Sequence, residues 1–157
     1  MKAVVLAGGF GTRIQPLTSN IPKPMLPIMN RPMLEMILDR LDEMHVEEIS
    51  MLLYFMPERI VEYFEKRWKY RASLHYIVPD GDYGTAGSVK FASKSLDDSF
   101  LVMSGDLVTD IDLAKAIRFH KRKGSMATIV LTSVSNPLQF GVVIADEGGR
   151  IKDFLEK

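Results

Sequence analysis

The chain contains no cysteine, few histidines and no long apolar run. Without cysteine it can form neither a disulfide framework nor a thiolate metal site. Its three histidines, His45, His75 and His120, are too far apart in sequence for a zinc-binding spacing. No apolar segment is long enough to span a bilayer, and no signal-peptide core follows the Met-Lys start. These absences predict a cytoplasmic protein that is not bound to a membrane.

Net charge is also missing, because 20 lysines and arginines balance 20 aspartates and glutamates. A neutral chain lacks the broad attraction that nucleic acids and anionic membranes usually require. The basic and aromatic cluster Lys66–Arg71 falls at the end of a predicted helix, where cations complement the helix dipole. We therefore expect no nucleic-acid partner, and any phosphate site must be local.

What the chain does contain is an ordinary globular balance over 157 residues, with 46% apolar and 25% charged residues. This length suits one domain with a substantial core. Short apolar runs alternate with helical patterns of apolar residues. The predicted strands are Lys2–Ala7, Glu48–Phe55, Leu74–Val78, Ser99–Met103 and Ser125–Val134. The predicted helices are Arg31–His45, one that starts at Pro57, Thr85–Leu96 and one from Asp112 to Lys123.

A β-hairpin is expected to follow, with strands Phe140–Ala145 and Arg150–Leu155. The alternation before the hairpin predicts an α/β fold, a Rossmann-like, mostly parallel sheet with flanking helices. In such sheets ligands bind at the carboxyl ends of the strands. Gly8-Gly9, the turn at residues 82–84 and Asp106 all follow predicted strands, so one cleft could collect them.

The long segment Gly8–Pro24 carries the main chemical signal. Its glycines allow a tight turn and a close approach of the backbone to a ligand, so that N–H groups can converge on phosphate oxygens. Arg13 adds a planar, bidentate donor that suits a pyrophosphate. Lys23 lies between two prolines that stiffen its backbone, and its ammonium can balance charge on a reacting phosphorus. The pattern indicates a polyphosphate site rather than a solvated surface loop.

Two familiar phosphate-binding loops are excluded by the spacing of the residues. The chain has no G-x-x-x-x-G-K-[ST] segment. Gly9-Phe10-Gly11 is not followed by the third glycine of a dinucleotide fingerprint, and a loop rather than a helix comes next.

Two further segments are candidates for the same site. Asp106 follows a buried strand, where a carboxylate can hold Mg²⁺ against phosphate oxygens, although one carboxylate alone is a weak magnesium site. The segment Gly84–Gly87 opens a helix, and its first-turn N–H groups and small side chains could accept a base or a sugar. A tight helix start packed on the sheet explains the second segment equally well.

Several motifs together resemble the sugar-1-phosphate nucleotidyltransferase family, also called the nucleotide-sugar pyrophosphorylases. They are Gly8-Gly9-Phe10-Gly11-Thr12-Arg13, Pro16-Leu17-Thr18, Pro22-Lys23-Pro24-Met25, Tyr83-Gly84-Thr85-Ala86-Gly87, Ser104-Gly105-Asp106, Phe140-Gly141-Val142-Val143 and Phe154-Leu155-Glu156-Lys157. The resemblance covers essentially the whole chain. It is strongest to the mannose-1-phosphate guanylyltransferase branch and implies the nucleotide-diphospho-sugar transferase fold.

The resemblance implies a reaction between an NTP and a sugar-1-phosphate that gives an NDP-sugar and pyrophosphate, with Mg²⁺ and without a covalent enzyme intermediate. By resemblance, Arg13 would hold the leaving pyrophosphate, Lys23 would contact the reacting phosphates and Asp106 would bind Mg²⁺. The nucleotide would be held by Leu6, Ala7, Gly8, Gly9, Gly11, Thr12, Arg13, Gly84, Thr85 and Ala86. The sugar phosphate would contact Lys23, Gly141, Glu156 and Lys157.

One departure from the family pattern is the end of the chain at Lys157. The resemblance implies further strands, helices and a second metal-binding aspartate beyond this point, so residues 1–157 are expected to be a nucleotidyltransferase domain truncated at its C-terminal end. Such a piece could bind nucleotide with little turnover. Some members of the branch carry a phosphomannomutase-like domain downstream. The sequence is also compatible with a homo-oligomer. The alternatives are a non-catalytic nucleotide- or sugar-nucleotide-binding regulatory module and an unrelated α/β transferase that shares only the glycine loop.

Overall fold

A computed structural model describes residues 1–81, 83–93, 96, 98–137 and 140–155. The chain divides into two compact units, Met1–Leu113 and Ala114–Lys157, and each is considered by itself. In the part of the chain that the structure describes, no helix has the length and apolar character needed to cross a membrane.

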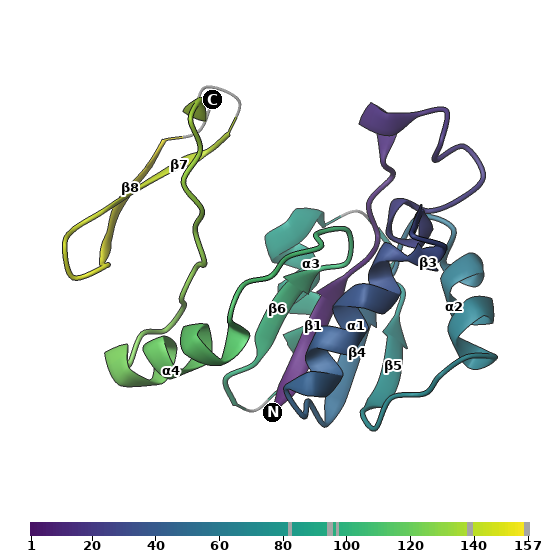
Figure 1. The fold of residues 1–157 in the computed structure, drawn as a ribbon, viewed down its shortest axis with the longest axis horizontal. Helices are drawn as coiled ribbons and strands as arrows, with labels where there is room; N and C mark the ends of the chain where they lie inside the picture. The colour runs from purple at the N-terminus through teal and green to yellow at the C-terminus, as the bar shows by residue number, and fades with distance from the viewer. Residues whose placement is uncertain (82, 94–95, 97, 138–139, 156–157) are drawn as a thin grey trace. The chain divides into compact units, whose positions relative to one another are not determined.

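The first unit is built on a parallel sheet whose strand order is β5-β4-β1-β6 (Figure 1). Its strands are β1 (Lys2–Leu6), β4 (Glu48–Leu52), β5 (Ser73–Ile77) and β6 (Leu101–Ser104). In the central strand β1, the side chains of Ala3, Val4 and Val5 have no solvent exposure. A strand buried on both faces reads as a continuous apolar run, and this explains why it could be recognised in the sequence.

Helices cover both faces of this sheet. Helices α1 (Met33–Glu43) and α2 (Pro57–Glu65) contribute apolar residues to the larger core cluster, which includes Ala3 and Val5 of β1. Helix α3 (Gly84–Ala92) contributes Ala92 to a smaller cluster with Val4. Adjacent residues of a strand point to opposite faces, so the two clusters lie on the two sides of the sheet. The predicted α/β fold with flanking helices is confirmed.

The loop between β1 and α1 contains only short elements. These are the 3₁₀ turns η1 (Thr12–Ile14) and η2 (Lys23–Met25) and the antiparallel ribbon of β2 (Pro27–Ile28) and β3 (Arg31–Pro32). The predicted helix from Arg31 begins two residues later, at Met33, because Arg31 and Pro32 pair with β2 instead.

A charged network ties this ribbon to α1. Arg31 donates to Glu35 at 2.8 Å and to Asp39 at 2.6 Å, and Lys69 lies 3.3 Å from Glu35. The Tyr70 hydroxyl donates to Asp39 at 2.9 Å. Burial raises the pKa of each carboxyl group, but the hydrogen bonds from Arg31 and its neighbours outweigh burial and hold the pKa values of Glu35 and Asp39 below their usual range. The network anchors the loop at the end that leads into α1.

The second unit contains α4 (Leu113–Lys123), which begins at the boundary, and an antiparallel hairpin of β7 (Val142–Ala145) and β8 (Ile151–Leu155). The hairpin confirms the prediction from the sequence. The predicted strand Ser125–Val134 is wrong, because these residues form no strand in the structure. A strand forms only where a neighbouring strand pairs with its N–H and C=O groups. Among the described residues, no strand pairs with this segment.

Candidate functional site

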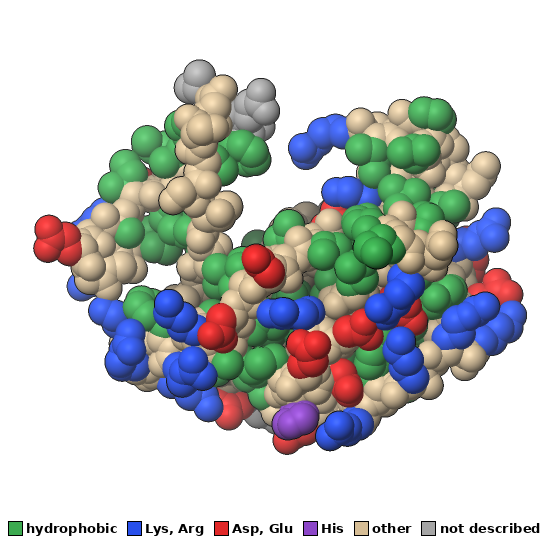
Figure 2. Space-filling view, viewed as in Figure 1, with side chains coloured by type: hydrophobic (Ala, Val, Ile, Leu, Met, Phe, Trp, Pro, Cys, Tyr) green, Lys and Arg blue, Asp and Glu red, His purple; other side chains and the backbone are tan. Residues whose placement is uncertain are grey.

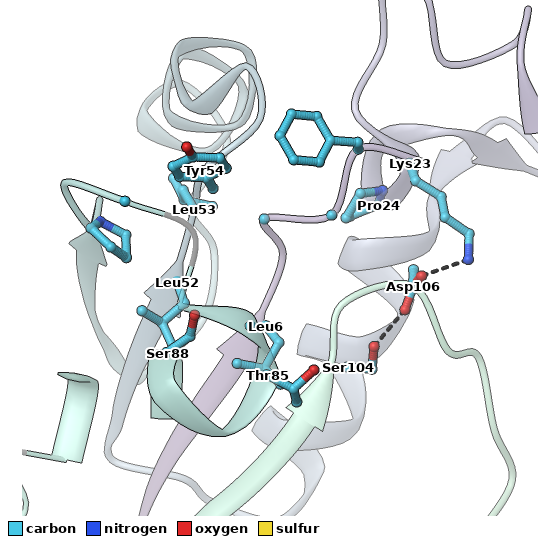
Figure 3. Close-up of a pocket in the computed structure, with 16 residues that line it drawn as sticks. Leu6, Lys23, Pro24, Leu52, Leu53, Tyr54, Thr85, Ser88, Ser104 and Asp106 are labelled. Carbon is cyan, nitrogen blue, oxygen red and sulfur yellow. Dashed lines mark hydrogen bonds and ion pairs between the residues drawn. The ribbon is translucent and has the colours of Figure 1, made fainter. Parts of the chain in front are cut away.

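The carboxyl ends of the parallel strands surround a pocket of about 340 Å³ (Figure 3). Residues that end or follow β1, β4, β5 and β6 line it, together with the first turns of α3. They are Leu6, Gly8, Gly9, Phe10, Lys23, Pro24, Leu52, Leu53, Tyr54, Pro79, Gly81, Gly84, Thr85, Ser88, Ser104 and Asp106. The sheet topology thus gathers the separate sequence signals at one edge, as expected for an open parallel sheet.

An ion pair between Lys23 and Asp106 is the polar centre of this pocket. Lys23 Nζ lies 2.5 Å from Asp106 Oδ2, and the Ser104 hydroxyl donates to Asp106 Oδ1 (Figure 3). The Lys23 and Asp106 side chains are about one-third exposed, at 34% and 30%. Burial raises the pKa of Asp106, but the hydrogen bonds from Lys23 and Ser104 outweigh it and hold that pKa below its usual range. Asp106 is therefore a carboxylate at neutral pH.

Gly105 explains why Asp106 reaches the pocket. Its N–H donates to the carbonyl of Leu6 at 2.7 Å, and a Cβ at this position would lie 2.9 Å from that oxygen. Only glycine lets the turn after β6 lie this close to the end of β1. The close approach places Asp106 beside the loop that carries Lys23.

The glycine turn after β1 is held by two close packing contacts. A Cβ on Gly8 would lie 2.9 Å from Tyr54 Cβ. Gly11 has a φ of +65°, and a Cβ there would lie 2.8 Å from Thr18 Cγ2 and 3.2 Å from Lys23 Cβ. The buried Thr18 hydroxyl donates to the Gly11 carbonyl at 2.9 Å. Gly11 thus allows the loop to fold back so that Lys23 enters the pocket.

The first turns of α3 form another side of the pocket. Gly84 has a φ of +62° at the first residue of the helix, and Thr85 and Ser88 line the pocket. The N–H groups of a first helical turn have no partner within the helix. They are well suited to bind an electronegative ligand atom.

Two residues of the pocket carry oxygen atoms that could bind Mg²⁺. Asp106 and Ser104 supply oxygen atoms, the ligand type that Mg²⁺ prefers. Among the residues that the structure describes, no three carboxylate or imidazole groups cluster as a metal site. The donor set fits Mg²⁺ only if phosphate oxygens of a ligand complete the coordination, as they commonly do for this ion.

Seven of the predicted site residues line the pocket: Leu6, Gly8, Gly9, Lys23, Gly84, Thr85 and Asp106. Five other predicted residues of the first unit do not line it: Ala7, Gly11, Thr12, Arg13 and Ala86. Ala7 is buried directly after β1, and the Gly11 backbone lies close to Thr18 and Lys23. Arg13 and Thr12 are exposed on η1, and Ala86 is exposed on α3. Gly141 belongs to the second unit, and Glu156 and Lys157 lie outside the described residues.

Sequence reasoning missed several residues that the structure places in or around the pocket. Thr18 and Ser104 orient Gly11 and Asp106 through their hydroxyl groups. Tyr54 and Pro79 enter from the ends of β4 and β5. Thr18 and Ser104 lie within motifs that can be recognised in the sequence, but the sequence predicts only a buried strand around Tyr54.

The fold and the pocket define an α/β protein with a ligand site at the strand ends. The model of the family described as nucleotidyl transferase matches residues 2–157. The chain therefore belongs to the nucleotidyl transferase family.

Curated relatives agree with this family. The whole chain is 36% identical to a UTP–glucose-1-phosphate uridylyltransferase of Synechocystis sp., of which it covers 44%. It is 37% identical to a mannose-1-phosphate guanyltransferase of Aspergillus oryzae, of which it covers 45%. The chain thus spans about 45% of the length of such relatives.

Solved structures show the same fold. HddC from Yersinia pseudotuberculosis, complexed with GMP-PN, matches 99% of the chain with a TM-score of 0.79 and 27% identity, and the match covers 69% of HddC. A putative glucose-1-phosphate thymidylyltransferase from Bacillus anthracis matches 99% of the chain with a TM-score of 0.87. Its identity of 24% supports the fold alone, and the match covers 64% of that protein.

Proposed function

We propose that this chain supplies the nucleotide-binding part of a sugar-1-phosphate nucleotidyltransferase. The reaction joins an NTP to a sugar-1-phosphate and releases pyrophosphate, with GTP and mannose-1-phosphate as the favoured substrates. The observation that carries the proposal is the meeting of Lys23 and Asp106 beside the glycine turn, in one pocket at the strand ends. The family and the names of the relatives support the same reaction class.

In this reaction a phosphate oxygen of the sugar-1-phosphate attacks the α-phosphorus of the NTP. A new oxygen–phosphorus bond forms, and the bond from the α-phosphorus to the oxygen that bridges to the β-phosphate breaks, so that pyrophosphate leaves with the electron pair. Phosphoryl-type transfers depend mainly on positioning and on electrostatic stabilisation. Lys23 supplies a fixed positive charge at the pocket, and the backbone of Gly8 and Gly9 allows close approach of the phosphates.

We propose that Mg²⁺ binds with Asp106 as its protein ligand and that phosphate oxygens supply most of the remaining coordination. When bound, the ion would neutralise phosphate charge and polarise the oxygens of the transferred group. Asp106 is ionised at neutral pH and accepts a hydrogen bond from Ser104, so its carboxylate would bind the ion in exchange for Lys23. Arg13 is proposed to hold the leaving pyrophosphate.

A non-catalytic nucleotide-binding module is the rival to this proposal, because Asp106 is the single carboxylate among the described residues that line the pocket. Release of pyrophosphate from GTP and mannose-1-phosphate, with Mg²⁺, separates the two. Turnover by the complete protein supports the enzyme. Saturable GTP binding without turnover of any sugar phosphate would instead support the module.

The base and the sugar need a wider screen, because the relatives include a uridylyltransferase and guanyltransferases. Four NTPs combined with glucose-1-phosphate and mannose-1-phosphate distinguish these specificities. Preference for UTP and glucose-1-phosphate would overturn the proposed substrates but not the reaction class. A cytoplasmic location, a homo-oligomer and a downstream phosphomannomutase-like domain stay predictions.

A further inference from the structure

The pocket has two chemically different ends. Lys23, Ser104 and Asp106 form a charged end beside β1 and β6. Tyr54 and Pro79 follow β4 and β5 on the other side of β1. Figure 3 shows Tyr54 and the Lys23–Asp106 pair on opposite sides of the pocket. A ligand that is anionic at one end and flat and apolar at the other would fit this arrangement.

The separation of the two ends suits a nucleotide. Neighbouring strands lie about 4.8 Å apart, so the ends of β4 and β6, with β1 between them, are about 10 Å apart. In a nucleotide, the ribose holds the base several ångströms away from the α-phosphate, so one ligand can reach both ends of the pocket. With phosphates at the Lys23 end, the base falls at the end of β4.

We propose that Tyr54 is the residue against which the nucleotide base stacks, with Phe10 as its support. This inference rests on the proposed function and adds to it a residue for the base. The Tyr54 side chain is 38% exposed and the Phe10 side chain 45% exposed, although both line the pocket. Aromatic side chains with this much exposure inside a concave site can bury further apolar surface against a ligand.

The Tyr54 ring is already positioned by the protein. It packs edge to face with Phe10, with ring centroids 5.6 Å apart and planes at 83°. A contact of this geometry leaves at least one face of the Tyr54 ring without contact to Phe10. Phe10 is itself supported by Phe55 at 5.3 Å. Base–aromatic stacking needs such a rigid surface and tolerates every base, because each base has a π face.

The backbone around Tyr54 is also fixed. Leu53 N–H donates to Ile77 O at 2.9 Å, and Phe55 N–H donates to Gly8 O at 3.3 Å. Gly8 leaves no room for a Cβ beside Tyr54. A side chain held on both sides binds with a smaller entropic cost than a mobile one. The glycine turn thus contributes to both ends of the pocket, because it allows phosphates to approach the backbone and packs against Tyr54.

Binding of two probes to the complete protein, measured without sugar phosphate so that no transfer occurs, tests the proposal: the GTP analogue GMPPNP and inorganic tripolyphosphate, which has no base. Titration calorimetry with Mg²⁺ gives both dissociation constants. We expect Tyr54→Ala to weaken GMPPNP binding about 10-fold and to change tripolyphosphate binding less than about 2-fold. Tyr54→Phe retains the ring and should bind both probes like the wild type. The loss should be larger for a purine than for a uridine analogue, because a purine offers more stacking area.

Lys23→Ala is the matched comparison, because it should weaken both probes. Tyr54→Leu keeps an apolar contact with Phe10 and replaces the alanine variant if that variant does not fold. Unchanged GMPPNP binding in Tyr54→Ala or Tyr54→Leu would overturn the stacking role and leave the proposed function standing. Equal losses for both probes, or a Tyr54→Phe variant as weak as Tyr54→Ala, would also overturn it. Failure of the wild type to bind any NTP analogue would instead overturn the proposed function.

Discussion

Lys23 and Asp106 are 83 positions apart in sequence and form an ion pair of 2.5 Å at the carboxyl ends of β1 and β6. The proposed phosphate-binding cation and the proposed metal-binding carboxylate therefore neutralise each other in this structure. A polyphosphate would compete with Asp106 for Lys23, and a divalent cation would compete with Lys23 for Asp106. The two residues are thus expected to act as a unit.

Substitution of this pair should lower catalysis strongly. We expect Lys23→Ala and Asp106→Ala each to reduce kcat/KM of the complete protein by about 100-fold, the scale of losing one key electrostatic contact in a transition state. The double variant should be little worse than either single one, because residues that act together give non-additive effects. Pyrophosphate release measures all three rates.

Lys66→Ala is the control for this experiment. It breaks the exposed Lys66–Glu62 pair of 2.8 Å, and neither residue lines the pocket. Its kcat/KM should match the wild type within about 2-fold, since exposed pairs contribute little. Near-normal rates for both Lys23→Ala and Asp106→Ala would contradict the site assignment.

Gly11→Ala should destabilise the protein, whereas Gly9→Ala should not. Alanine at position 11 would adopt a φ of +65° and place a Cβ 2.8 Å from Thr18. The left-handed conformation alone costs about 1–3 kcal/mol for a residue with a side chain. A Cβ on Gly9 meets nothing within 4 Å, so the free energy of unfolding should change by less than about 0.5 kcal/mol. Urea denaturation measures both values, and equal losses would show that the loop relaxes around Gly11.

Acid should remove the contribution of Asp39 to stability. Arg31, Tyr70 and Lys69 surround this carboxylate, and its pKa lies below the usual range because their hydrogen bonds and charges outweigh burial. A lowered folded-state pKa means that the stabilisation is present above the unfolded pKa of about 3.9 and is lost as the pH falls through the folded pKa. Asp39→Asn should therefore cost about 1 kcal/mol at pH 7 and progressively less below pH 4.

Urea unfolding of the wild type and of Asp39→Asn between pH 7 and pH 3 measures this difference. Glu62→Gln is the matched control, because Glu62 pairs with Lys66 at the surface. Its effect should be small at every pH. A difference for Asp39→Asn that stays constant down to pH 3 would contradict the pKa direction.

Arg13→Ala should leave stability unchanged and weaken pyrophosphate binding. The Arg13 side chain is exposed on η1, so its removal should change the free energy of unfolding by less than about 0.5 kcal/mol. Loss of a charge-assisted contact to a pyrophosphate should weaken inhibition by pyrophosphate about 10-fold. Inhibition assays with added pyrophosphate measure this effect. If the variant altered only the KM for the sugar phosphate, the proposed division of the pocket would be wrong.

Local sequence patterns determined most of the fold. The apolar runs at Lys2–Leu6 and Glu48–Leu52 and the helical stripe of α1 were predictable because buried strands and amphipathic helices have their own periods. The segment Ser125–Val134 shows the limit of this reasoning. Its composition favours a strand, but a strand exists only where a neighbouring strand completes its hydrogen bonds. The sequence of the segment does not show which strand, if any, lies beside it.

For the candidate site, the sequence determined the chemistry of the parts: a glycine turn, Lys23 between prolines and Asp106 after a strand. Only the tertiary structure decided that Lys23 and Asp106 touch, that Arg13 remains outside the pocket wall and that Tyr54 lies inside it. The reason is physical. Distances between residues far apart in sequence depend on the order of strands in the sheet and on close contacts such as Gly105 against Leu6. These relationships come from packing of the whole unit, and no local pattern contains them.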